Sequence, residues 1–138
     1  ETADHSLPYC VAVAILDGVV GLEQFQEARF TEKKLMDLVS RVVVRVDPAF
    51  NDRYPDSIPN KITVTMRDGR QFSEEVQYPT GHSGNPMTDA EVEQKFKLLA
   101  RGNIASKGID EILRCLWSLE DLEDAHDLMM MFSGYVQR

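Results

Sequence analysis

The sequence predicts an α+β protein, and three observations support this class. Helical patterns, with apolar residues three or four positions apart, occur on both sides of a central stretch. Within that stretch the period changes, because β-branched residues follow one another or alternate with polar residues. The stretch also contains the turn sequence Arg67-Asp68-Gly69-Arg70. Together these features predict a small three-stranded antiparallel sheet with flanking helices.

The first predicted helix runs from Leu7 to about Asp17 and is apolar on every side. Ser6 is a good N-cap, Pro8 lies in the first turn, and Gly18 suits the C-terminal end. A helix that is apolar all round is normally a buried helix. Because a domain of this length rarely surrounds one helix completely, we expect this helix to pack against protein outside this chain.

Two shorter helices are predicted next, at residues 21–30 and 32–40. In the first of them, Leu22 and Phe25 are expected to face inward and Arg29 outward. The second has an apolar stripe that would pack on the same core.

Three strands are predicted after these helices, at residues 42–46, about 62–66 and 71–77. The hairpin between the second and third strands allows two registers. A two-residue Asp-Gly loop would place Phe72 on the face opposite Val64. A three-residue loop pairs these two residues and keeps the apolar face together, with Gly69 in a left-handed conformation, so we favour it.

The C-terminal part is predicted to be helical. Thr88 and Glu91 form a capping-box sequence for a helix that ends near Arg101. Helices at residues 107–119 and 121–132 follow, each with an apolar face.

Composition excludes several classes of function. The formal charge of −8 argues against a nucleic-acid partner, since binding phosphates needs clustered lysine and arginine. Cys10 and Cys115 lie in apolar helical contexts and are expected to be reduced, buried hydrophobes. No metal-ligand spacing, membrane-spanning run or signal peptide is visible, so we expect a cytoplasmic protein without a membrane partner.

Candidate functional residues gather before and within the first helix. Tyr9 can donate or accept a proton, or it can be a core tyrosine with a satisfied hydroxyl. The helix N-terminus favours anions and could hold a substrate carboxylate, but capping by Ser6 with dipole stabilisation by Asp4 also explains the pattern. His5 is a base, a hydrogen-bond donor or a surface residue. His82 lies in a Gly/Pro-rich loop, where catalytic groups often occur.

Three blocks of sequence resemble one known family. They are TADHSLPYCVAVAILDG at the start, YPTGHSGNPMTDAEVEQKF at residues 78–96 and LEDLED at residues 119–124. Together they resemble the MmgE/PrpD family, which includes 2-methylcitrate dehydratase and cis-aconitate decarboxylase. The resemblance implies a large all-α domain and an α+β lid domain. Residues 1–101 would belong to the lid, and residues 102–138 would return to an all-α domain absent from this C-terminal fragment.

The resemblance also implies a reaction. We expect the full-length protein to be a hydro-lyase that dehydrates a tricarboxylate such as 2-methylcitrate, without a metal or organic cofactor, as a homodimer. This fragment alone is expected to be inactive. The alternatives are a sibling reaction, namely cis-aconitate decarboxylation or amino-dicarboxylate epimerisation, and a non-catalytic binding module.

Individual positions follow from the same resemblance. Tyr9 aligns with an active-site tyrosine of the decarboxylase members and is the first catalytic candidate. His5 matches the DHSLPY pattern of the dehydratases and is the second. Ser6 matches both branches, and the Gly81-His82 pair matches the family with no assigned role. We therefore expect Ser6 and His82 to bind substrate.

Overall fold

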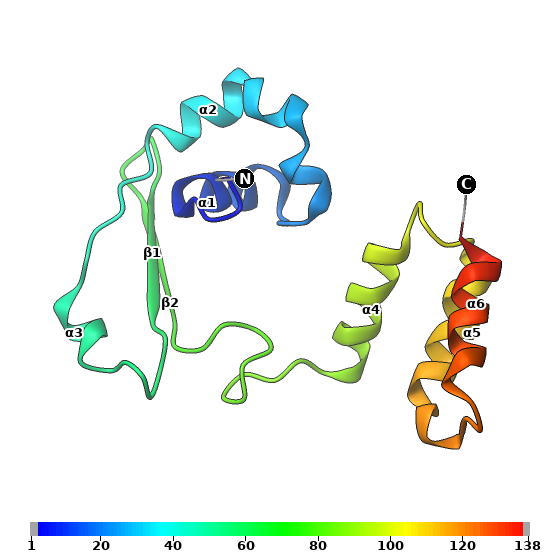
Figure 1. Ribbon diagram of the computed structural model, residues 1–138. Coiled ribbons are helices and arrows are strands. Elements are labelled where there is room, and N and C mark those ends of the chain that lie inside the picture. Colours follow the sequence, from blue (N-terminus) through cyan, green and yellow to red (C-terminus); the bar gives the residue numbers. More distant parts are fainter. Residues whose placement is uncertain (1–2, 137–138) are drawn as a thin grey trace. The chain divides into compact units, whose positions relative to one another are not determined.

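The computed structural model describes residues 3–136 (Figure 1). The chain divides into two compact units between Ser57 and Ile58. The first unit contains α1 (Leu7–Asp17), η1 (Leu22–Phe25), η2 (Glu27–Thr31), α2 (Lys33–Val39) and α3 (Pro48–Asn51). The second contains β1 (Asn60–Thr65), β2 (Gln71–Val76), α4 (Asp89–Ala100), α5 (Ser106–Trp117), η3 (Leu119–Asp121) and α6 (Ala125–Tyr135).

The core of the first unit forms where α1 packs against α2. Its buried residues are Tyr9, Ala12, Val13 and Leu35. The opposite face of α1 is not covered within the described residues, because Ile15 remains 48% exposed. The predicted helix is therefore present, and only one of its faces is buried in this chain.

The helix predicted at residues 21–30 is wrong in type, since the segment forms the two short 3₁₀ helices η1 and η2. The predicted faces hold only in part, because Phe25 packs against the core as expected but Leu22 and Arg29 do not follow the prediction. Leu22 is 70% exposed, whereas the Arg29 side chain is only 24% exposed. A 3₁₀ helix has about three residues per turn, so assigning faces with a 3.6-residue period places side chains wrongly.

The predicted three-stranded sheet is also wrong, because β1 and β2 are the only strands among residues 3–136. Residues 42–47, where the third strand was expected, form neither helix nor strand. Val43 and Val46 are 71% and 81% exposed. β-branched residues favour extended backbone, but a strand also needs a partner for its main-chain groups, and local sequence does not show whether one exists. The α+β class itself holds.

The hairpin has the favoured register. β1 and β2 are antiparallel, with Val64 opposite Phe72 and Thr65 opposite Gln71. Gly69 has a φ of 87°, and its N–H donates to the Met66 carbonyl oxygen at 3.0 Å. The three-residue turn with a left-handed glycine is therefore confirmed.

The helices of the second unit largely follow the prediction. At the start of α4, the Thr88 hydroxyl accepts from the Glu91 N–H, and the Glu91 carboxylate accepts from the Thr88 N–H. α5 packs against α6, and Ile112 is fully buried. The last helix begins later than predicted because Asp124 caps it. The proposed domain boundary after residue 101, in the turn between α4 and α5, stays a prediction.

Candidate functional site

Local sequence fixes the N-terminal end of α1. The Ser6 hydroxyl accepts from the Tyr9 N–H at 3.4 Å, and the helix ends at Gly18, whose φ is 73°. The predicted cap is therefore confirmed. His5 lies just outside this end, with 86% of its side chain exposed and Nε2 3.7 Å from Oδ2 of Asp4. Neither contact tests whether Ser6 or His5 acts on a substrate.

Tyr9 points into the core and is only 4% exposed. Its hydroxyl donates to the main-chain carbonyl oxygen of Gln24 at 2.6 Å. Its ring contacts the rings of Phe25 and Phe30, with centroid distances of 5.7 and 5.5 Å. Burial is the main cause that raises the pKa of the Tyr9 phenol above 10.0. The phenol is thus neutral near pH 7, and its proton is donated to Gln24.

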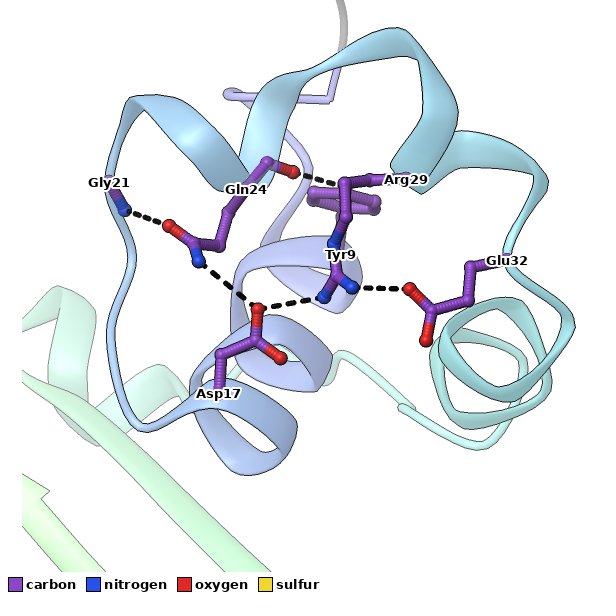
Figure 2. Close-up of polar contacts among 6 residues, drawn as sticks. All are labelled: Tyr9, Asp17, Gly21, Gln24, Arg29 and Glu32. Atoms are coloured by element: carbon purple, nitrogen blue, oxygen red, sulfur yellow. Dashed lines mark hydrogen bonds and ion pairs between the residues drawn. The ribbon is translucent and has the colours of Figure 1, made fainter. Parts of the chain in front are cut away.

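A polar network surrounds Tyr9 (Figure 2). The Gln24 amide accepts from the Gly21 N–H and donates to Oδ2 of Asp17, both at 3.1 Å. Arg29 donates to the same Asp17 oxygen at 2.7 Å and also to the Glu32 carboxylate. One guanidinium therefore ties the end of α1 to the segment that leads into α2. Gln24 contacts α1 twice, through its side chain to Asp17 and through its main-chain carbonyl to the Tyr9 hydroxyl.

Sequence reasoning did not find this network. Asp17 and Arg29 are 12 positions apart, and no periodic pattern relates residues at that distance. The sequence also predicted that Arg29 faces outward, which is the opposite of its place in this network. One local signal was available, because Glu32 lies three positions after Arg29, a spacing at which opposite charges on a helix can pair.

His82 belongs to the second unit, whereas His5, Ser6 and Tyr9 belong to the first. Its ring stacks on Tyr78, with a centroid distance of 4.9 Å and an interplanar angle of 14°. Its Nδ1 accepts from the Gly84 N–H at 3.0 Å. The loop therefore holds the imidazole in a defined orientation.

The other features that would bear on function in residues 3–136 are metal-ligand clusters, membrane-spanning helices, free thiols and cavities. Among residues 3–136, no three His, Cys, Asp or Glu residues gather as a metal site would need, and no helix is long and apolar enough to cross a membrane. Cys10 and Cys115 are free thiols and partly buried. A cavity of about 350 Å³ lies where α4 meets α5, lined by Lys97, Arg101, Gly102, Ile104, Ser106, Ile109 and Asp110, and it contains none of the predicted site residues.

Known proteins resemble this chain over most of its length. Human cis-aconitate decarboxylase is 27% identical over 96% of the chain. The 2-methylcitrate dehydratase of Salmonella typhimurium is 36% identical over 58% of it. A 2-methylcitrate dehydratase-like protein of Aspergillus oryzae is 31% identical over 80%. The matched part is 27%, 18% and 24% of these relatives, so the chain spans about a quarter of their length or less.

A comparison with protein families agrees with these relatives. Residues 1–120 match the MmgE/PrpD C-terminal domain, which is most of the chain. The chain therefore belongs to the MmgE/PrpD family.

Proposed function

We propose that this chain is part of a hydro-lyase that dehydrates a hydroxy-tricarboxylate such as 2-methylcitrate. The observation that carries the proposal is the match to the MmgE/PrpD C-terminal domain, together with relatives named 2-methylcitrate dehydratase at 32–36% identity. The family resemblance further supports an enzyme that is a cytoplasmic homodimer, uses no metal or organic cofactor and includes an all-α domain.

The proposed chemistry is an elimination of water. A base removes the proton on the carbon next to a carboxylate, and the electron pair of that C–H bond becomes the new C=C bond. The C–O bond of the hydroxyl breaks, and an acid supplies the proton with which the hydroxyl leaves as water. Tyr9 is the proposed acid, since it aligns with an active-site tyrosine of the family and its phenol carries a proton near pH 7. In the described structure that proton is donated to Gln24, so a substrate oxygen would have to replace this carbonyl as the acceptor.

The remaining candidates are proposed to bind or assist. The exposed imidazole of His5 and the hydroxyl of Ser6 lie at the N-terminal end of α1, where unpaired N–H groups favour a carboxylate. His5 is the second catalytic candidate, and Ser6 and His82 are proposed to contact substrate oxygens. The chain's own charge of −8 disfavours a tricarboxylate, so the cations that hold it are proposed to lie outside these residues.

A second candidate function is decarboxylation of cis-aconitate. The observation that favours it is coverage, because the human decarboxylase matches 96% of the chain. The two reactions start from different acids and release different products, water in one case and carbon dioxide in the other.

The test uses the complete gene product that carries this chain. Purified protein is given 2-methylcitrate, and the ultraviolet absorbance of the unsaturated acid is followed. In parallel it is given cis-aconitate, and carbon dioxide release is measured. Enzyme-dependent absorbance with the first acid supports the dehydratase. Carbon dioxide from the second acid alone would replace the dehydratase with the decarboxylase, and no turnover of either acid by folded protein would contradict both.

A further inference from the structure

The segment 78–85, between β2 and α4, is folded onto itself by hydrogen bonds. The Gly81 N–H donates to the Asn85 carbonyl oxygen and the Asn85 N–H to the His82 carbonyl oxygen, both at 2.8 Å. The His82 N–H donates to the Pro79 carbonyl oxygen at 3.1 Å, and the Asn85 side-chain amide donates to the Tyr78 carbonyl oxygen at the same distance. The backbone around His82 is therefore held in one arrangement, as a loop that positions a side chain must be.

Glycines make this arrangement possible. Gly81 has a φ of 91°, a left-handed conformation that disfavours other residues. A Cβ added at Gly84 would lie 2.8 Å from the Tyr78 ring, which is closer than side chains tolerate. Gly84 can thus approach the Tyr78 ring closely. Its N–H reaches Nδ1 of His82, and the His82 ring stacks on the same Tyr78 ring.

The hydrogen bond from Gly84 selects one tautomer of the neutral imidazole. Nδ1 can accept an N–H only with its lone pair free, so Nδ1 carries no proton. A neutral imidazole then carries its single proton on Nε2. The bonded ring thus presents Nε2–H as a donor, and among residues 3–136 no hydrogen bond of Nε2 is recorded.

We propose that the loop 78–85 presents His82 as a neutral hydrogen-bond donor, through Nε2–H, to a carboxylate or carbonyl oxygen of the substrate. This inference rests on the proposed function, which supplies a substrate rich in such oxygens. It gives His82 a binding role and excludes it as the base, because Nδ1 already accepts from Gly84 and Nε2 already carries the ring proton. To accept a proton on Nε2, the ring would have to move its own proton to Nδ1 and lose the bond from Gly84.

Two substitutions of His82 test the roles of its two ring nitrogens separately. In His82→Asn, the side-chain oxygen lies near the position of Nδ1, so the bond from Gly84 is kept and the Nε2–H donor is lost. In His82→Gln, the longer side chain places an amide N–H near the position of Nε2. His126→Asn, in α6, is the matched control, because the His126 side chain is exposed and outside the proposed site.

The kinetic test uses the complete gene product and whichever acid it turns over. His82→Asn is expected to raise KM about 10- to 100-fold with little change in kcat. This is the loss expected for one hydrogen bond to a charged group, when that bond holds the substrate and the transition state equally. His82→Gln should recover part of that loss, and His126→Asn should match the wild type. An unchanged KM in His82→Asn, or a fall in kcat with the loss of the acidic limb of the pH profile, would overturn the donor role. Thermal melting of each variant shows whether it is folded.

A spectroscopic test does not depend on turnover. Nitrogen-15 NMR of histidine-labelled protein should show His82 with a protonated Nε2 and an unprotonated Nδ1, assigned by the signals lost in His82→Asn. The opposite tautomer would overturn the inference. Propane-1,2,3-tricarboxylate, which lacks the hydroxyl to eliminate, should shift the Nε2 signal on binding. Binding that leaves this signal unmoved would overturn the donor role, whereas no binding and no turnover, with the expected tautomer present, would instead refute the proposed substrate class.

Discussion

At the scale of single residues, the hydroxyl of Tyr9 has both a structural and a proposed chemical role. It is 4% exposed and donates to the Gln24 carbonyl oxygen, so it satisfies a buried acceptor. The same proton is the one that the proposed elimination would use. Removing the hydroxyl separates the two roles, because stability and turnover are measured independently.

Tyr9→Phe in the complete gene product is therefore expected to lower kcat about 100-fold, the usual size of a lost general acid. It should also lower the free energy of unfolding by about 1 kcal/mol, because the Gln24 carbonyl is left unpaired. Steady-state kinetics and urea unfolding measure these effects. A change in KM alone would show that Tyr9 positions substrate and is not the acid, and a stability loss without any kinetic change would leave it a core residue.

The pH dependence of stability is the second prediction for Tyr9. Its pKa in the folded protein is raised above 10.0, chiefly by burial, so folding favours the protonated phenol. This contribution is complete below about pH 10 and is lost as the pH rises through the folded-state pKa. The free energy of unfolding should thus fall more steeply above pH 10 in the wild type than in Tyr9→Phe. Tyr135, whose pKa is raised mainly by its hydrogen bond to Glu111, acts in the same direction, so the comparison is repeated in a Tyr135→Phe background.

Arg29 supports a third prediction. Its guanidinium, 24% exposed, bridges Asp17 and Glu32. Arg29→Met leaves two partly buried carboxylates without their cation and should cost about 1–3 kcal/mol of stability. The control is Arg70→Met, because Arg70 is 68% exposed in its pair with Asp68 and should contribute at most about 1 kcal/mol. Urea unfolding of both variants measures the difference, and equal losses would show that the Arg29 network does not stabilise the fold.

At the scale of elements, the packing of α5 on α6 depends on Gly108. A Cβ at this position would lie 2.2 Å from Cγ and 2.5 Å from Cβ of Tyr135. These atoms are close to the backbone of α6, so they cannot move away as the tip of a flexible side chain could. The two helices must separate if the residue is enlarged.

Gly108→Ala is therefore expected to destabilise the protein by about 1–3 kcal/mol through overpacking, although alanine is the better helix former. Gly134→Ala in α6 is the matched control. Nothing lies within 4 Å of a Cβ built there, so the same change should stabilise by about 0.5 kcal/mol. Melting temperatures should move in opposite directions, and a shift of the same sign in both variants would contradict the close approach of the helices.

The elements that sequence predicted well are those set by neighbours in the chain. The cap at Ser6, the capping box of Thr88 and Glu91, and the turn at Gly69 each need only a few adjacent residues. The elements it missed depend on distant partners. The valines at 42–46 lack a neighbouring strand, and the inward position of Arg29 depends on Asp17 in another helix.

The same division applies to the candidate site. The position of Tyr9 within the first turns of α1 was predictable, because the cap fixes the start of the helix. The acceptor of its hydroxyl was not, since it is a main-chain carbonyl in a 3₁₀ helix that periodicity assigned as α-helical. For His82, the glycines indicated a turn, whereas the bond that fixes its tautomer became visible only in the folded loop.

At the scale of the whole molecule, much apolar surface remains uncovered within the described residues. Large exposed side chains occur on α1, on residues 42–46, on the hairpin and on α6, among them Leu7, Val46, Phe72 and Met129, each at least 56% exposed. Single exposed apolar residues are ordinary, but so many in one chain favour a surface that another part of a protein covers. The relatives are about four to six times longer than their matched parts, which agrees with such a cover.

The last prediction follows from this surface. The isolated 138-residue chain should bind 1-anilinonaphthalene-8-sulfonate strongly and self-associate in size-exclusion chromatography, because its apolar residues meet solvent. The complete gene product, at equal molar concentration, should bind several-fold less dye and elute as one species. Circular dichroism of the isolated chain is needed alongside, since an unfolded chain would give little dye signal for a different reason. A folded, monodisperse chain with no dye binding would instead favour a self-contained binding module, the one reading of this sequence in which Tyr9 has no reaction to catalyse.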